Sequence, residues 1–313
     1  MSPRRIIIDT DPGRDDAVAI LLALAAPEAV EVMALTTVAG NVSVAQATDN
    51  ALKVLEFAGR TEIPVYRGAT HALRHDFDAE PRHHGETGLG GTVLPEPRTR
   101  PQSRPAAEFL IETLRAEPPG TVTLVTIGPL TNIATVLAEA PDIAPRIAEI
   151  VIMGGAYFEV GSMTPTAEFN IYCDPEAAKA VFACGAPITV FPLDVTYRCL
   201  VTPARLAAFR ALGTPIGPAV AGWTDFAGRG DLEKFGGRGA PLHDPCTIAY
   251  LIEPKLFQGR QINVEIETDS PLCRGMTVAD WWGITDRPRN ALFMGGVDAD
   301  GFFELLTTRL AAL

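Results

Sequence analysis

The sequence predicts an α/β protein built on an open, mostly parallel sheet with a Rossmann-like core that is flanked by helices. One observation is that β-branched runs alternate with alanine- and leucine-rich stretches of helical spacing through roughly the first two hundred residues. Another is that no repeat, low-complexity tract or shift in composition marks a boundary along the 313 residues. We therefore expect a single domain over 1–313 whose last third adds a C-terminal helical layer.

The first expected elements are a strand, a helix and a second strand, joined by short turns. Three isoleucines form the first β-branched run, and Pro12 and Gly13 turn the chain before the first helix. Ser43 is a suitable N-cap for the second helix, and Gly59 stands beyond its end. Up to residue 68 we expect strands over 6–8, 30–40 and 63–68, and helices over 15–26 and 44–58.

The segment 69–105 is rich in proline, glycine and histidine and shows no sustained period, so we expect a long loop that is a functional lid or a disordered segment. The motif "DADG" over 298–301 resembles the start of an EF-hand, but Arg309 stands where that loop needs glutamate, and a hairpin turn is expected instead. The other expected elements are helices over 106–116, 129–140, 174–185 and 244–252, helical pieces within 203–227, and strands over 121–128, 149–156, 187–195, 261–268 and 290–297.

Composition and charge limit the classes of partner. The chain has 26 basic and 38 acidic side chains, and this net charge of −12 argues against nucleic acid or an anionic membrane as the main partner. The apolar stretch 17–26 is shorter than the roughly 20 residues of a membrane helix. "MSPRR" leads directly into the first strand without a secretory h-region, so we expect a cytoplasmic location. The five cysteines are widely spaced, which favours reduced thiols over a zinc site.

Four carboxylates are crowded into the stretch "IIIDTDPGRDDAVAI", directly after the first apolar run: Asp9, Asp11, Asp15 and Asp16. Ionised neighbours about 4 Å apart repel by about 4 kcal/mol at an effective dielectric of about 20, so they need a cation, hydrogen-bond donors or a shared proton. Helix capping and turn chemistry would explain any one of them. Four together at a strand-to-helix switch predict a metal or substrate site.

Other polar or glycine-rich positions also follow predicted strands. Asn41, Ile127 with Gly128, and the stretch 153–155 all stand where a strand is expected to end. In open α/β sheets, ligands bind beyond the carboxyl ends of the strands. We therefore expect these positions to gather around the same site as the acids.

Six sequence blocks, in this order, carry a resemblance to a known family: "DTDPGRDDAVAI", "TTVAGN", "IGPLTNIA", "VIMGGA", "TAEFNIYCDPEAA" and "LHDPCTIAYLI". They resemble the calcium-dependent nucleoside N-ribohydrolases of the inosine-uridine-preferring family, and most of all its bacterial pyrimidine-preferring branch. The resemblance covers nearly the whole chain. It implies a homo-oligomer, a dimer or a tetramer, whose substrate is a small ribonucleoside.

The resemblance implies a Ca²⁺ cofactor. Its ligands would be the side chains of Asp11, Asp16 and Asp244 and the backbone carbonyl of Ile127. All are hard oxygen donors, which suit Ca²⁺ with its 6 to 8 oxygen ligands better than they suit zinc. Three carboxylates around one dication would also remove the repulsion among the crowded acids.

The reaction implied by the resemblance is hydrolysis of the N-glycosidic bond, to free base and ribose, by a Ca²⁺-activated water through an oxocarbenium-like transition state. Asp11 would be the catalytic base, and His243 would protonate the leaving base. Either His83 or His84, in the long loop, would approach the base when the loop closes. The expected substrate-binding residues are Asp15, Asn41, His84, Met153, Glu168 and Asn170.

Less specific interpretations remain open at this stage. Asn41 could accept a turn conformation after Gly40, Glu168 could cap a helix, and His243 could be a hydrogen-bonded structural residue. For the whole protein, a metal-dependent phosphohydrolase is one alternative, because "DTD" after a strand resembles an aspartyl-phosphate motif. Pro12 and Gly13 break that motif. A ribose- or calcium-binding protein without turnover is the other alternative.

Overall fold

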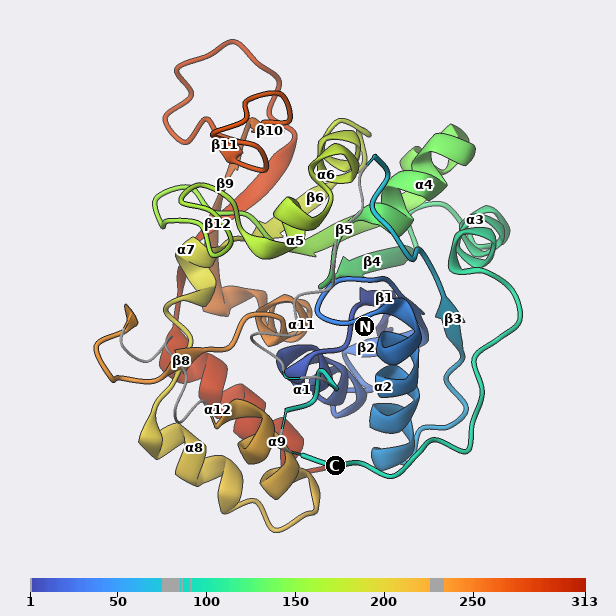
Figure 1. The fold of residues 1–313 in the computed structure, drawn as a ribbon, viewed down its shortest axis with the longest axis vertical. Coiled ribbons are helices and arrows are strands. Elements are labelled where there is room, and N and C mark those ends of the chain that lie inside the picture. Colours follow the sequence, from blue (N-terminus) through green and yellow to red (C-terminus); the bar gives the residue numbers. More distant parts are fainter. Residues whose placement is uncertain (1, 75–84, 86, 91, 226–233) are drawn as a thin grey trace.

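The computed structural model describes residues 2–74, 85, 87–90, 92–225 and 234–313, and its centre is an eight-stranded sheet (Figure 1). The strand order is β3-β2-β1-β4-β5-β6-β12-β9. Every neighbouring pair is parallel except β12 and β9, which confirms the predicted fold class. The strands are β1 (Arg4–Thr10), β2 (Val30–Thr37), β3 (Val65–Arg67), β4 (Val122–Thr126), β5 (Ile147–Met153), β6 (Ile188–Phe191), β9 (Phe257–Ile262) and β12 (Ala291–Val297).

Helices cover both faces of this sheet, each over its own buried apolar cluster. In Figure 1 the C-terminal helices lie beside the first helix of the chain, which places the predicted helical layer on that face. That face carries α1 (Arg14–Leu24), α2 (Val44–Phe57), α8 (Pro203–Arg210), α9 (Ile216–Thr224), α11 (Pro245–Ile252) and α12 (Ala299–Leu310), and the other face carries α3 (Ala106–Ala116), α4 (Thr131–Glu139) and α6 (Pro175–Phe182).

Shorter elements connect these layers. They are α5 (Phe169–Cys173), α7 (Leu193–Thr196), the 3₁₀ turns η1 (Pro141–Arg146) and η2 (Pro254–Leu256), and two small antiparallel pairs made of β7 (Leu200–Val201) with β8 (Ala240–Pro241) and β10 (Val264–Ile266) with β11 (Thr277–Ala279). The described part of the loop 69–105 contains no helix or strand, as predicted. Among the helices that the structure describes, none has the length and apolar character needed to cross a membrane.

Local capping explains where several helices begin. Ser43 Oγ accepts a hydrogen bond from the backbone N–H of Gln46 at 3.3 Å, as the sequence predicts for α2. Asp174 accepts from the N–H of Ala177 at 3.0 Å at the start of α6. In α1 the N-cap is Gly13, and Asp16 in the first turn bonds back to it, because its Oδ2 accepts from the N–H of Gly13 at 2.9 Å.

Two predicted strands differ most from the structure. The predicted strand 187–195 ends at Phe191, because Pro192 has no N–H for the ladder and the chain continues as the short helix α7. The predicted strand 261–268 is divided at Asn263. After it, β10 leaves the main sheet to pair with β11, and the Asn290 side chain takes over hydrogen bonds to the backbone of Val264.

The hairpin turn expected at "DADG" is wrong. Asp298 instead caps α12, and its Oδ1 accepts from the N–H of Gly301 at 3.0 Å. This helix is therefore an element that was not expected from the sequence. Its buried residues Phe302, Phe303, Leu306 and Leu310 have the helical spacing that would have indicated it.

Candidate active site

Four of the predicted site residues lie at the ends of four neighbouring parallel strands, which are in the order β2, β1, β4 and β5. Because these strands are parallel, their carboxyl ends lie at one edge of the sheet. Asn41 follows β2, Asp11 follows β1, Ile127 follows β4, and Met153 is the last residue of β5. The sheet therefore brings together segments that are far apart in the chain.

The Asp11 side chain is fully buried, and it fills a space that exists because two neighbouring residues are glycines. Its Oδ2 accepts a hydrogen bond from the backbone N–H of Asn41 at 2.6 Å. Within the described part of the chain, its Oδ1 has no hydrogen-bond partner. A Cβ atom at Gly40 would lie 2.1 Å from Oδ2, and one at Gly128 would lie 2.7 Å from Oδ1. The carboxylate therefore fits only because both neighbours are glycine.

Three further carboxylates form a compact acidic cluster of Asp15, Asp16 and Asp244. One oxygen from each lies within 4.8 Å of the others. Asp15 and Asp16 are in the first turn of α1, and Asp244 directly precedes α11, which packs against α1. Asp11 lies outside this group of three, although its charge acts on Asp244. Asp15, which the resemblance implies as a substrate-binding residue, is thus itself a member of this cluster.

Asp16 is held in place by three hydrogen bonds. The Thr10 hydroxyl donates to its Oδ1 at 2.6 Å, and the Gly13 N–H donates to its Oδ2 at 2.9 Å. The Asn41 side-chain amide donates to the same Oδ2 at 3.2 Å. Asn41 thus joins Asp11 and Asp16, one through its backbone and the other through its side chain.

The acids are costly to ionise together. Burial raises the pKa of Asp11 and of Asp244 well above the ordinary range, and the neighbouring carboxylates raise both further. Burial, with the charge of Asp15, raises the pKa of Asp16 to about 6. A bound cation would reverse this penalty by stabilising the ionised forms.

These residues fit a hard divalent cation. The side-chain donors of the cluster and of Asp11 are all carboxylate oxygens, the ligand type that Ca²⁺ and Mg²⁺ prefer. The unpartnered Asp11 Oδ1 is an additional buried acceptor beside them. The site therefore has the charge and the ligand type for a metal ion.

A second group of predicted residues surrounds the Ile127 carbonyl. The Asn170 side-chain amide donates to the backbone oxygen of Ile127 at 3.2 Å and to that of Met153 at 3.0 Å. Gly128, next to Ile127, is one of the two glycines against Asp11. The structure therefore joins this group to the acidic side of the site.

Glu168 is the N-cap of α5, so the capping interpretation of this residue is correct. Its carboxylate accepts from the backbone N–H groups of Gly155 at 3.0 Å, Asn170 at 2.9 Å and Ile171 at 3.2 Å. Burial raises the pKa of Glu168 to about 7, although these hydrogen bonds act in the opposite direction. Its contact with ribose stays a prediction.

His243 directly precedes Asp244 and is half-buried. Its Nδ1 lies 2.8 Å from the hydroxyl of Thr196, and its ring lies edge-on to Tyr197 with 5.8 Å between the ring centroids. The predicted base-contacting residues His83 and His84 lie outside the described residues.

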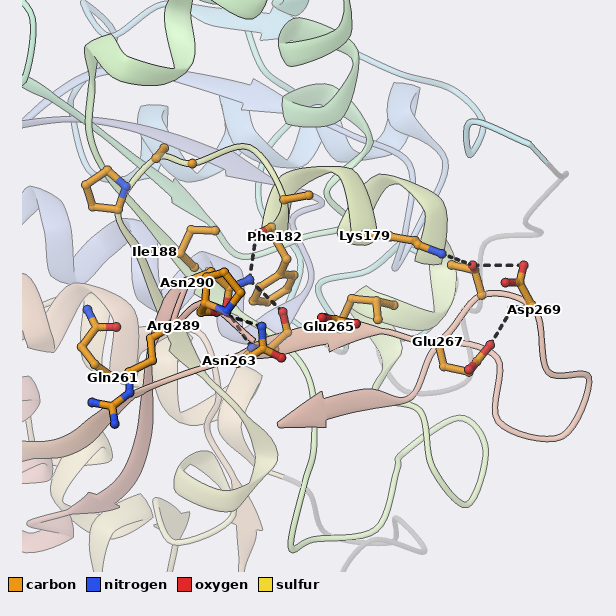
Figure 2. A pocket seen from close by; sticks show the side chains of 18 residues that line it. Lys179, Phe182, Ile188, Gln261, Asn263, Glu265, Glu267, Asp269, Arg289 and Asn290 are labelled. Carbon is orange, nitrogen blue, oxygen red and sulfur yellow. Dashed lines mark hydrogen bonds between the residues drawn. The ribbon is translucent and has the colours of Figure 1, made fainter. Parts of the chain in front are cut away.

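A separate cavity of about 950 Å³ lies away from this site (Figure 2). Among its lining residues, Ile188 begins β6 and Asn290 directly precedes β12. The cavity is thus at the amino ends of the parallel strands, opposite the acids. Of the predicted site residues that the structure describes, none lines it.

Sequence reasoning missed several residues that shape the site. Gly40 and Gly128 were noticed only as turn residues or strand ends, although each is the last residue of a predicted strand, a position that suggests a close approach of backbone. Thr10 lies in the same short stretch as its partner Asp16 but was not singled out, and Thr196 had no local signal because its partner His243 is distant in sequence.

The comparisons with known proteins agree with this geometry. A family model described as inosine-uridine preferring nucleoside hydrolase matches residues 6–304, and the chain belongs to this family. The pyrimidine-specific ribonucleoside hydrolase RihA of Enterobacter sp. (strain 638) is 46% identical over 307 residues, which are 98% of this chain and 97% of that protein.

Solved structures that resemble this one belong to the same class of protein, the nucleoside hydrolases. The purine-preferring ribonucleoside hydrolase from Gardnerella vaginalis superposes with a TM-score of 0.91 at 34% identity, covering 98% of each chain. A plant nucleoside hydrolase gives a TM-score of 0.93 at 35% identity, covering 99% of this chain and 100% of that one. The protein is thus an enzyme, a ribonucleoside N-ribohydrolase.

Proposed function

We propose that this enzyme hydrolyses pyrimidine ribonucleosides, uridine and cytidine first, at the carboxyl edge of its sheet with the help of Ca²⁺. The observation that carries this proposal is the acidic cluster, in which Asp244 meets Asp15 and Asp16 from the opposite end of the chain. Neither alternative, a phosphohydrolase or a binding protein without turnover, agrees with the family to which the chain belongs.

The proposed ligands of Ca²⁺ are Asp11, Asp16 and Asp244, together with the carbonyl of Ile127. When bound, the ion would lower the pKa of a water molecule and supply coordination for ribose hydroxyls. Thr10 and Asn41 support this role, because they hold Asp16 in a fixed orientation.

Asp11 is the proposed general base. Its Oδ2 is engaged by the N–H of Asn41, and its buried Oδ1 is the oxygen that would take the proton of the attacking water. Gly40 and Gly128 fix the position of this carboxylate by their close approach.

The proposed ribose contacts are Asp15, Asn41, Glu168 and Asn170, with Met153 beside them. Asn170 already links the backbone of Ile127 to that of Met153, so a sugar bound here would touch both halves of the site. The buried carboxylates would favour a ring that gains positive charge in an oxocarbenium-like transition state.

His243 is the proposed general acid for the leaving base. A departing nucleobase anion is a poor leaving group, and protonation by a positioned side chain contributes about 10² to 10⁴ in rate. The position of His243 directly before Asp244 places it at the border of the acidic cluster.

The preference for pyrimidines is supported by the relative named as pyrimidine-specific at 46% identity. The purine-preferring neighbour is less similar, at 34% identity.

The experiment that tests the proposal measures ribose release from uridine, cytidine, inosine and adenosine. We expect the two pyrimidine nucleosides to be hydrolysed faster, and Asp11→Asn to lose turnover while it stays folded. The matched control is Asp174→Asn, another fully buried aspartate, which caps α6. Wild-type turnover in Asp11→Asn, or no ribose from any of the four nucleosides, would contradict the proposal.

A further inference from the structure

The short helix α7 is firmly anchored beside the site. It follows β6, and the N–H of Leu193 donates to the carbonyl of Gly155 at 2.9 Å. The carboxylate of Asp194 accepts from the backbone N–H groups of Tyr157 at 2.9 Å and Phe158 at 2.7 Å. Side chains on α7 therefore have a fixed position relative to the strand ends.

The last residue of this helix, Thr196, is fully buried and contacts His243. The distance between Thr196 Oγ1 and His243 Nδ1 is 2.8 Å, the length of a good hydrogen bond. The ring of Tyr197, the next residue, packs edge-on against the same imidazole at an interplanar angle of 61°. The imidazole is thus held by two consecutive residues of one rigid segment.

We propose that Thr196 is a positioning residue that binds His243 through Nδ1, so that the proton on Nε2 is the one delivered to the departing base. This inference rests on the proposed role of His243 as the general acid. An imidazole ring can turn about its Cβ–Cγ bond, and a hydrogen bond from one nitrogen fixes which nitrogen faces the reaction.

The proton transfer from His243 to the base is balanced when Thr196 Oγ1 accepts a hydrogen bond from the Nδ1–H of His243 throughout. The protonated imidazole carries N–H groups at both nitrogens, and the Nδ1–H donates to Thr196 Oγ1. The Nε2–H bond breaks and a new N–H bond forms on the base, which keeps the electron pair of the broken glycosidic bond. The neutral imidazole that remains is the tautomer with its hydrogen on Nδ1, still donating to Thr196.

The test compares Thr196→Ser with Thr196→Ala, because both lose the methyl group and only alanine also loses the hydroxyl. The substrates are uridine and a 4-nitrophenyl riboside, whose leaving group needs no proton. We expect Thr196→Ala to lower kcat for uridine by about 10- to 100-fold through loss of orientation. We expect kcat for the nitrophenyl riboside and KM for uridine to stay within about twofold. Thr196→Ser should restore most of the uridine activity.

The control for a lost buried hydroxyl is Thr48→Ala, since Thr48 is also fully buried and its hydroxyl bonds the carbonyl of Val44 at 2.6 Å. It should leave kcat for both substrates near wild type. Equal uridine kcat in Thr196→Ser and Thr196→Ala would overturn the inference, and so would an equal loss on both substrates in Thr196→Ala.

The variant His243→Ala distinguishes a failure of the positioning role of Thr196 from a failure of the acid role of His243. A loss confined to uridine in His243→Ala, with an unaffected Thr196→Ala, would overturn the positioning role alone. Equal losses on both substrates in His243→Ala would remove the acid role of His243, and the positioning role with it.

Discussion

Substitution of Gly40 by alanine is expected to displace the Asp11 carboxylate and to remove most of the hydrolase activity. The new Cβ would lie 2.1 Å from Asp11 Oδ2, whereas real Cβ contacts shorter than 3.0 Å essentially never occur, so the carboxylate must move by about 1 Å. A displacement of this size in a reacting group can cost about 100-fold in rate, which corresponds to about 2.7 kcal/mol of activation free energy. The assay is kcat/KM for ribose release from uridine.

Gly213→Ala is the matched control for this prediction. Apart from its two chain neighbours, none of the described residues has an atom within 4 Å of the Cβ that it would introduce, so its activity should equal that of the wild type. Thermal unfolding of both variants would show that they are folded. A folded Gly40→Ala variant with wild-type kcat/KM would refute the idea that the glycine positions the catalytic carboxylate.

Two further substitutions test the network around the site. Thr10→Val removes the hydroxyl that donates to Asp16 at 2.6 Å. We expect this variant to bind Ca²⁺ about 10- to 100-fold more weakly, as measured by calorimetry. An unchanged affinity for Ca²⁺ would contradict the role of Thr10 in orienting the ligand Asp16. Glu168→Gln tests the raised pKa of Glu168 in the metal-free protein. The unfolded chain loses this proton near pH 4.5 and the folded protein near pH 7, so folding stability should fall by up to about 3 kcal/mol as pH rises between them. Urea unfolding across this range should show a smaller fall in Glu168→Gln, and an identical pH dependence would contradict the assignment.

Much of the fold could be predicted because its signals are local. Helical periodicity and a capping side chain are enough to place α2 after Ser43. The helix α7 could not be predicted in this way, because "PITVFPLDV" reads as one strand unless Pro192 is taken as its end. The interruption at Asn263 depends on the side chain of Asn290, which is distant in sequence.

One part of the site could be predicted from the sequence, because its aspartates are crowded into one short stretch. The crowded aspartates indicated an acidic site from the local sequence, whereas only the family resemblance implied that Asp244 joins them, and the structure places Asp244 within 4.8 Å of Asp15 and Asp16. The contact of Thr196 with His243 comes only from the folded chain, whereas the place of Gly40 at the end of a predicted strand indicated a close approach of backbone but not that its partner is Asp11. The oligomeric state, the roles of individual residues and the identity of the metal stay predictions.

The most direct test of the central claim is ribose release from uridine by enzyme whose metal has been removed with a chelator, before and after Ca²⁺ is restored. If the acidic cluster and Asp11 act through a divalent ion, turnover should disappear on removal and return with calcium. Full turnover by protein shown to be free of metal would contradict the account.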